Sequence, residues 1–152
     1  MDKKAWLRIQ KYCAWQERCH QEVRAKLKSL GVYGLDCEEM ISRLIEENFL
    51  NEERFSRAYA GGKFRVRKWG RERIRRELKQ RQISAYCIRV GLEEINEDQY
   101  QQTMDDLIKT KMQSWPDLSD FDRNGKVAAF LIRKGYETDL VWNRVKAYPS
   151  EK

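Results

Sequence analysis

The strongest chemical signal in this 152-residue chain is a run of positive charge between residues 63 and 81. The run holds ten basic side chains and two acidic ones, Glu72 and Glu77, while the whole chain has a net charge of only +7. The planar guanidinium of arginine binds phosphate through two hydrogen bonds at once, and clustered positive charge speeds encounter with polyanions. We therefore assign a contact surface for nucleic acid or an acidic protein to Lys63, Arg65, Arg67, Lys68, Arg71, Arg73, Arg75, Arg76 and Lys79.

Local ion pairs should absorb only part of this charge. Glu72 and Glu77 precede Arg76 and Arg81 by four residues, a spacing that favours two weak pairs on a helix surface. None of the remaining basic residues of the run follows an acidic residue by four positions. They are therefore expected to face solvent or a partner.

Residues suited to catalysis or metal binding are few. The chain has a single histidine, His20, its four cysteines form no CxxC pair, and no glycine-rich loop is present to hold a phosphate group. The adjacent acids Asp105 and Asp106 would point about 100° apart on a helix, which suits a solvated face. We expect no enzymatic activity, no metal site, no cofactor, and thiols that are reduced and partly buried.

The elements that must position the basic run show an internal repeat. Three predicted helices start with a capping aspartate or asparagine, followed four residues later by an aromatic residue. These pairs are Asp2 and Trp6, Asn51 and Phe55, and Asn96 and Tyr100. A second helix in each repeat carries two apolar residues four apart, then a stop and one more apolar residue. The sets are Val23, Leu27, Gly31 and Val32; Ile74, Leu78, Gln82 and Ile83; and Val127, Leu131, Gly135 and Tyr136.

A third helix closes each repeat, predicted over residues 36–48, 84–95 and 138–147. The first of these should begin with a capping box between Asp36 and Glu39. A loop is predicted over residues 114–120, which contain proline and several capping residues. The predicted fold class is all-α, a tandem array of three three-helix repeats, elongated and bent. The repeats span residues 1–48, 49–95 and 96–148.

The helix predicted from Phe55 to Trp69 leads into the basic run. Its apolar positions, which include Tyr59, Gly62 and Val66, recur at steps of four and three and should pack inward. The glycine pair at positions 61 and 62 should bend this helix or let a neighbour approach closely. Trp69 and Phe64 could stack on nucleic-acid bases, but packing in the core or at its rim is the preferred interpretation.

The middle repeat resembles the central motif of the RecX family, in which an E-R-F helix precedes a basic stretch, a glycine, R-I-x-x-E-L and a K-G-I stop. The corresponding segments here are Glu53-Arg54-Phe55, the basic residues from Lys63 to Lys68, Gly70, Arg73-Ile74-Arg75-Arg76-Glu77-Leu78, and Arg81-Gln82-Ile83. The sequence departs from the family pattern at Gly61-Gly62, at Trp69 and at Gln82.

This resemblance implies a regulator of the RecA recombinase. Family members are described as lying in the groove of the RecA–DNA filament and as usually suppressing ATP hydrolysis, strand exchange and coprotease activity. The expected partners are therefore the RecA filament and single- or double-stranded DNA, in DNA repair and the SOS response. The resemblance supplies no list of contact residues, so the nine site residues rest on charge alone.

Two other functions stay open. A helical DNA-binding module would bind DNA without a filament, although the arginines surround their helices and only Gln80 and Gln82 could read bases. The second open function is that of a scaffold that binds a different acidic protein. The N-terminal residues predict neither a signal peptide nor a membrane span, so we expect a cytoplasmic protein. We also expect it to be a monomer.

Overall fold

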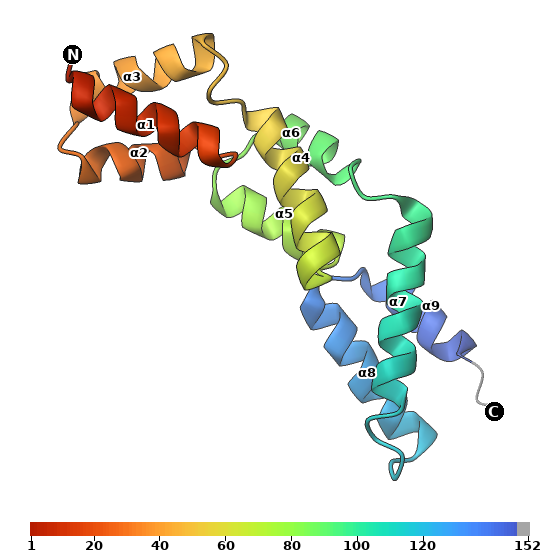
Figure 1. Ribbon diagram of the computed structural model, residues 1–152. Helices are drawn as coiled ribbons and strands as arrows, with labels where there is room; N and C mark the ends of the chain where they lie inside the picture. The colour runs from red at the N-terminus through yellow and green to blue at the C-terminus, as the bar shows by residue number, and fades with distance from the viewer. Residues whose placement is uncertain (149–152) are drawn as a thin grey trace. The chain divides into compact units, whose positions relative to one another are not determined.

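The computed structural model describes residues 1–148, and every regular element in that range is a helix (Figure 1). In chain order the elements are α1 (Lys3–Trp15), α2 (His20–Ser29), α3 (Gly34–Glu46), α4 (Glu52–Gly62), the π-helix η1 (Lys63–Arg67), α5 (Arg71–Gln80), α6 (Ala85–Leu92), α7 (Glu97–Met112), α8 (Asp120–Lys134) and α9 (Thr138–Ala147). The predicted all-α fold is confirmed. The loop predicted over residues 114–120 is confirmed for residues 114–119, between α7 and α8, whereas Asp120 is the first residue of α8.

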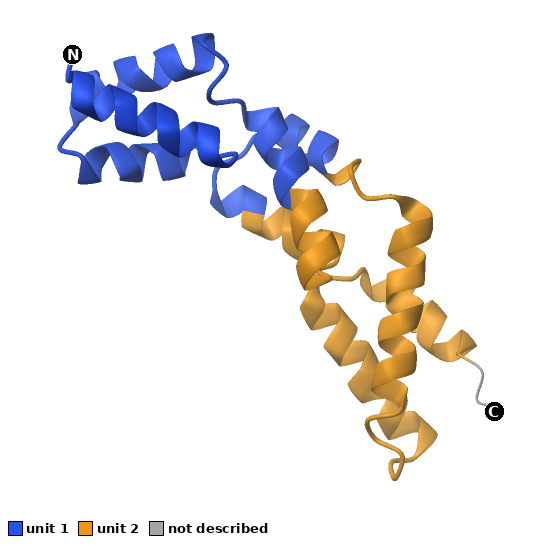
Figure 2. Ribbon diagram, in the orientation of Figure 1, with its two compact units in different colours: residues 1–59, 78–91 blue, residues 60–77, 92–152 orange. Residues whose placement is uncertain are grey.

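The chain divides into two compact units (Figure 2). Unit 1 comprises residues 1–59 and 78–91, and unit 2 comprises residues 60–77 and 92–152. The division falls inside α4 and inside α5, so each of these helices contributes residues to both units.

Unit 1 buries the apolar faces of its helices in a continuous core. Helix α2 packs against both α1 and α3, and Ile9, Val23, Leu27 and Leu44 are fully buried among them. A side-chain carbon at Gly91 in α6 would lie only 2.7 Å from the carbonyl oxygen of Ser56 in α4. Helices α4 and α6 therefore pack at a distance that glycine permits.

Unit 2 is built around α7, α8 and α9, which contact one another in every pair. Its largest buried side chains are Tyr100 and Tyr136, whose ring centroids lie 5.1 Å apart. Phe64, from η1, is also buried and lies 5.7 Å from Tyr100, centroid to centroid. This confirms that Phe64 serves core packing, so its ring is not free to stack on a base.

The three predicted helix starts are confirmed. The side chains of Asp2, Asn51 and Asn96 each accept a hydrogen bond from the backbone amide three residues later, at 3.1, 2.8 and 2.9 Å. The capping box predicted between Asp36 and Glu39 is wrong, because α3 begins at Gly34. Asp36 therefore lies inside the first turn, where its charge complements the helix dipole.

The three predicted helix stops also share one geometry. Gly31, Gln82 and Gly135 have φ angles of +84°, +59° and +109°. The next residue in each case donates its amide hydrogen to a carbonyl five residues earlier, at 2.9 Å for Val32, 3.2 Å for Ile83 and 3.1 Å for Tyr136. This left-handed ending satisfies carbonyls that the helix itself leaves unpaired.

Of the three residues that end these helices in the left-handed conformation, only Gln82 carries a side chain, and this side chain makes the conformation strained. The substitution Gln82→Gly should therefore stabilise the protein. Glycine adopts the left-handed conformation without steric cost, so we expect a gain of about 0.5–1 kcal/mol in the free energy of unfolding. Gly31→Ala is the matched reverse change, because nothing lies within 4 Å of the added carbon, and it should cost about 1 kcal/mol. Urea unfolding measures both. Equal stability of the Gln82→Gly variant and the natural chain would contradict the strain.

The helix that contains Gly61 and Gly62 changes its pitch instead of simply ending. Helix α4 passes directly into η1, and the chain then leaves the helix at Lys68, whose φ is +56°. The wider π turn shifts the residues that follow away from the spacing of an α-helix. The prediction that Val66 packs inward is therefore wrong, and its side chain is 78 % exposed.

Candidate functional site

The basic residues around η1 and α5 fall into groups with different surroundings. Arg65, Arg67, Lys68 and Arg76 of unit 2 are exposed, and within residues 1–148 none of them makes an ion pair. Lys79 is likewise exposed, in unit 1. These side chains are available to a partner.

Backbone contacts hold the exposed cations of η1 in place. The last residue of α8 and a residue that follows the helix supply two donors. Lys134 Nζ donates to the carbonyl of Arg67 at 2.9 Å, and the hydroxyl of Tyr136 donates to the carbonyl of Lys68 at 2.8 Å. Lys68 also donates its own amide hydrogen to the carbonyl of Phe64 at 3.0 Å. The loop that carries Arg67 and Lys68 is therefore a supported part of unit 2.

Lys134 adds a further positive charge that sequence reasoning missed. Burial lowers the pKa of Lys134, and the nearby charges of Arg73, Lys68, Lys111 and Arg67 lower it further. We call Arg67, Lys68, Arg73 and Lys134 the cationic cluster. No local sequence signal could have placed Lys134 in it, because more than sixty residues separate it from the others.

Trp69 lies at the rim of this cluster and is half-buried. The guanidinium carbon of Arg73 lies 4.2 Å from the centroid of its ring, and Lys63 Nζ lies 5.1 Å from it. Such cation–π contacts hold the two basic side chains against the indole. The preferred interpretation of Trp69 as a packing residue agrees with this position.

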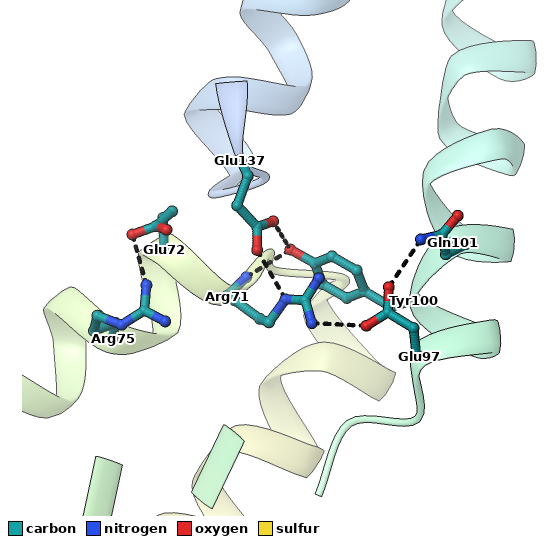
Figure 3. A network of polar contacts seen from close by, with 7 residues as sticks. All are labelled: Arg71, Glu72, Arg75, Glu97, Tyr100, Gln101 and Glu137. Atoms are coloured by element: carbon teal, nitrogen blue, oxygen red, sulfur yellow. Dashed lines mark hydrogen bonds and ion pairs between the residues drawn. The ribbon is translucent and has the colours of Figure 1, made fainter. Parts of the chain in front are cut away.

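Arg71 is engaged in an internal network, unlike its exposed neighbours (Figure 3). Its guanidinium lies 3.8 Å from the Tyr100 ring centroid, with Nη1 2.9 Å from Glu97 Oε1 and Nε 2.9 Å from Glu137 Oε2. The Tyr100 hydroxyl accepts from the Arg71 amide at 2.9 Å and donates to Glu137 at 2.6 Å. Since only 21 % of the Arg71 side chain is exposed, most of it is committed to holding α5 against α7 and the start of α9.

The same network perturbs its titratable groups in the expected directions. Burial, followed by the hydrogen bond to Glu137, raises the pKa of Tyr100. Hydrogen bonds from Gln101 and Arg71 lower the pKa of Glu97. The tyrosine therefore stays neutral and the glutamate charged, as a structural ion pair requires.

The pairing predicted between Glu72 and Arg76 is wrong. Glu72 instead pairs with Arg75, Oε1 to Nη1 at 2.7 Å, one residue closer along α5 (Figure 3). Both spacings bring side chains together on a helix, so spacing alone could not choose between them. Arg76 is consequently left exposed and Arg75 is partly engaged.

The described residues hold no group of three or more histidine, cysteine or acidic side chains suited to a metal ion. All four cysteines are free and buried, and burial raises the pKa of each thiol, to about 11 for Cys13. Such thiols are poor nucleophiles near neutral pH. Within residues 1–148, no helix combines the length and the apolar composition that crossing a bilayer requires.

The fold and this surface define a class of protein: an all-α protein of three-helix domains with a basic, largely exposed segment. Models of the second and third three-helix domains of RecX match residues 51–92 and 97–143, which together exceed half of the chain. The chain belongs to the RecX family.

Individual relatives agree with this assignment. Regulatory protein RecX of Bacillus cytotoxicus is 27 % identical over 139 residues, covering 91 % of this chain and 52 % of that protein, and its counterpart from Bacillus mycoides is 26 % identical with the same coverage. The chain thus spans about half the length of these curated relatives. The crystal structure of RecX from Lactobacillus salivarius matches with a TM-score of 0.85 at 19 % identity, over 95 % of this chain and 94 % of the other. A second crystal structure, of a regulatory protein RecX, has a TM-score of 0.84 at 20 % identity, over 95 % and 71 %. These two likenesses concern the fold.

Proposed function

We propose that this protein binds the RecA–DNA filament and inhibits the recombinase. Inhibition would reduce ATP hydrolysis, strand exchange and coprotease activity, and so moderate DNA repair and the SOS response. Membership of the RecX family, whose curated relatives are named regulatory proteins, supports this proposal. In this role the protein acts as a cytoplasmic monomer without catalytic chemistry, and its repeats are those of residues 1–48, 49–95 and 96–148.

The observation that carries the proposal is the cationic cluster together with the exposed arginines beside it. Burial, and then the charges of Arg73, Lys68, Lys111 and Arg67, lower the pKa of Lys134, so an anion bound beside these cations would relieve part of an electrostatic cost already present in the folded chain. A nucleoprotein filament offers phosphates and acidic side chains on one surface.

The proposed contact surface does not give equal importance to the nine residues assigned by charge. Arg65, Arg67, Lys68 and Arg76 are its centre, with Lys134 added. Lys63, Arg73 and Lys79 stay predicted contacts. Arg71 and Arg75 have internal ionic partners, so a structural role accounts for much of their charge.

The test is a double charge reversal, Arg67→Glu with Lys68→Glu. Both side chains are exposed and their contacts to α8 run through backbone carbonyls, so the fold should persist. We expect binding to RecA filaments on single-stranded DNA to weaken at least about tenfold, because two attractive charges become repulsive. The readout is the DNA-dependent ATPase rate of RecA at sub-stoichiometric amounts of each variant. Lys3→Glu with Lys4→Glu, an equal reversal on exposed residues of α1, is the control and should change binding less than about twofold.

A salt titration of binding to DNA alone separates the proposal from its alternative. Suppressed ATPase with weak DNA binding supports a filament regulator. An unchanged ATPase with tight, salt-sensitive DNA binding would instead identify a basic helical DNA-binding module. Full inhibition by the Arg67 and Lys68 double variant would remove the cationic cluster from the contact surface.

A further inference from the structure

Unit 2 contains a pocket of about 650 Å³ whose lining residues are all different from those of the cationic cluster. Its lining residues come from α8, from the loop before this helix and from α9. Its apolar lining comes chiefly from Trp115, Leu118, Phe121 and Trp142. A pocket of this size accommodates one or two large side chains of a partner.

One of the side chains that line this pocket, Phe121, is largely exposed to solvent. It is 87 % exposed in the first turn of α8, whereas the buried residues of this helix begin at Val127. The helix start is already capped by Ser119, whose hydroxyl accepts from the Asp122 amide at 3.2 Å. Neither capping nor core packing within the described residues therefore requires an aromatic ring at this position.

The charges around the pocket have one dominant sign. Lys126, Arg133 and Lys146 line it and are exposed, and within residues 1–148 none of them makes an ion pair. Lys126 Nζ lies 5.7 Å from the centroid of the Trp115 ring, so positive charge and aromatic surface are adjacent. Asp122 is the acidic residue of the described lining.

Acidic residues at the loop end distinguish two kinds of anionic ligand. Asp117, Asp120 and Asp122 follow one another closely there, and the Asp120 side chain is 81 % exposed even though it pairs with Arg123 at 3.0 Å. A nucleic-acid strand carries a phosphate at every nucleotide and would meet these acids as well as the cations. A short peptide can place its carboxylates beside the three cations and present uncharged groups to the acids. Charge complementarity therefore favours the peptide.

We propose that this pocket binds an acidic protein segment that inserts one aromatic or large aliphatic side chain between Phe121 and the two tryptophans. The segment's carboxylates pair with Lys126, Arg133 and Lys146, and its apolar anchor fills the cavity. An apolar anchor surrounded by matched charge is the usual arrangement of a small protein interface. The site shares no residue with the cationic cluster, and the proposal does not depend on the proposed role in recombination.

The experiment measures binding of labelled synthetic dodecapeptides by fluorescence anisotropy, with the full chain and no recombinase. Four peptides share the same acidic residues and carry phenylalanine, tryptophan, leucine or serine at the central position. We expect at least one of the three apolar peptides to bind at least tenfold more tightly than the serine peptide. A lysine-for-acid version of that peptide should lose binding by a similar factor.

Two variants locate the binding on the chain. Phe121→Ala removes the exposed ring and Arg133→Glu reverses one cation, and each should weaken binding of the best peptide about tenfold. Leu35→Ala is the matched control, because Leu35 is 88 % exposed, in α3 of unit 1, and it should change binding less than twofold. Both pocket residues are exposed, so circular dichroism should report a native fold.

Three results would overturn the proposal. One is that no apolar peptide binds more tightly than the serine peptide, and another is that Phe121→Ala and Arg133→Glu leave the affinity unchanged. The third is that a labelled twelve-nucleotide oligo(dT) binds more tightly than every peptide and loses this binding in the same two variants. That last outcome would make the pocket a nucleic-acid site.

Discussion

Gly70→Ala should destabilise unit 2 by roughly 3 kcal/mol or more, the largest effect that we expect from a single added methyl group. The new carbon would lie 2.3 Å from the carbonyl carbon of Gly135 and 2.4 Å from both its oxygen and the amide nitrogen of Tyr136. All three are backbone atoms, so no side chain can rotate to relieve the contact.

The clash would also break hydrogen bonds that join two helix ends. Gly70 donates its amide hydrogen to the carbonyl of Lys134 at 2.9 Å, and Glu72 donates to that of Gly135 at 2.8 Å. The free amides at the start of α5 and the free carbonyls at the end of α8 thus satisfy each other. Moving α8 away from Gly70 would leave both sets without partners.

Amide hydrogen exchange is the measurement for this variant, because it reports α7, α8 and α9 separately from α1, α2 and α3. In the Gly70→Ala variant we expect faster amide exchange in α7, α8 and α9. Gly62→Ala is the matched control, since nothing lies within 4 Å of the added carbon and the residue is helical. It should leave stability unchanged or raise it by up to about 1 kcal/mol. Native exchange rates in the Gly70→Ala variant would show that the helix ends can separate at little cost.

Arg71→Met should cost about 2 kcal/mol in the free energy of unfolding. Methionine retains much of the apolar volume but leaves Glu137, whose side chain is 22 % exposed, without its cationic partner. Removing one member of a buried ion pair costs about 3–5 kcal/mol, and the partial exposure of this one reduces the loss. The contact between the guanidinium and the Tyr100 ring is lost as well.

Urea unfolding followed by circular dichroism measures this loss, and Arg76→Met is the matched control. Arg76 lies on the same helix, is exposed and makes no ion pair within residues 1–148, so its replacement should change stability by less than about 0.5 kcal/mol. Equal stability of the two variants would mean that water stabilises the Glu137 carboxylate as effectively as the Arg71 guanidinium does.

This prediction changes how the basic run can be tested. A combined reversal of Arg71, Arg75 and Lys79 to glutamate would not test partner binding alone, because a glutamate at position 71 would face Glu97 and Glu137. Loss of binding in such a variant would then report damage to unit 2.

Local sequence patterns predicted the features whose cause is local. The caps at Asp2, Asn51 and Asn96 depend on a side chain reaching an amide three residues away. The left-handed stops at Gly31 and Gly135 depend on the conformational freedom of glycine, and the apolar pairs before them depend on helical spacing. Gln82 was recognised as a stop from its place in the repeat, although its side chain is ill suited to it.

Local patterns could not predict the structure where they allowed two or more arrangements of similar energy. The spacing of Glu72 allows a pair with either Arg75 or Arg76, and the surrounding structure selects Arg75. Likewise, the glycine pair permitted a bend or a close approach, and a π turn formed there and exposed Val66.

By itself, the sequence determined an all-α protein of the RecX family, the ends of most of its helices, and a concentration of positive charge between residues 63 and 81. Only the tertiary structure decided which of those charges are available. It placed Arg71 between Glu97 and Glu137, brought the half-buried Lys134 beside Arg67, Lys68 and Arg73, and brought Gly70 against Gly135. The physical reason is that Coulomb interactions and packing depend on distance in space, whereas sequence patterns report only neighbours within a few turns of helix.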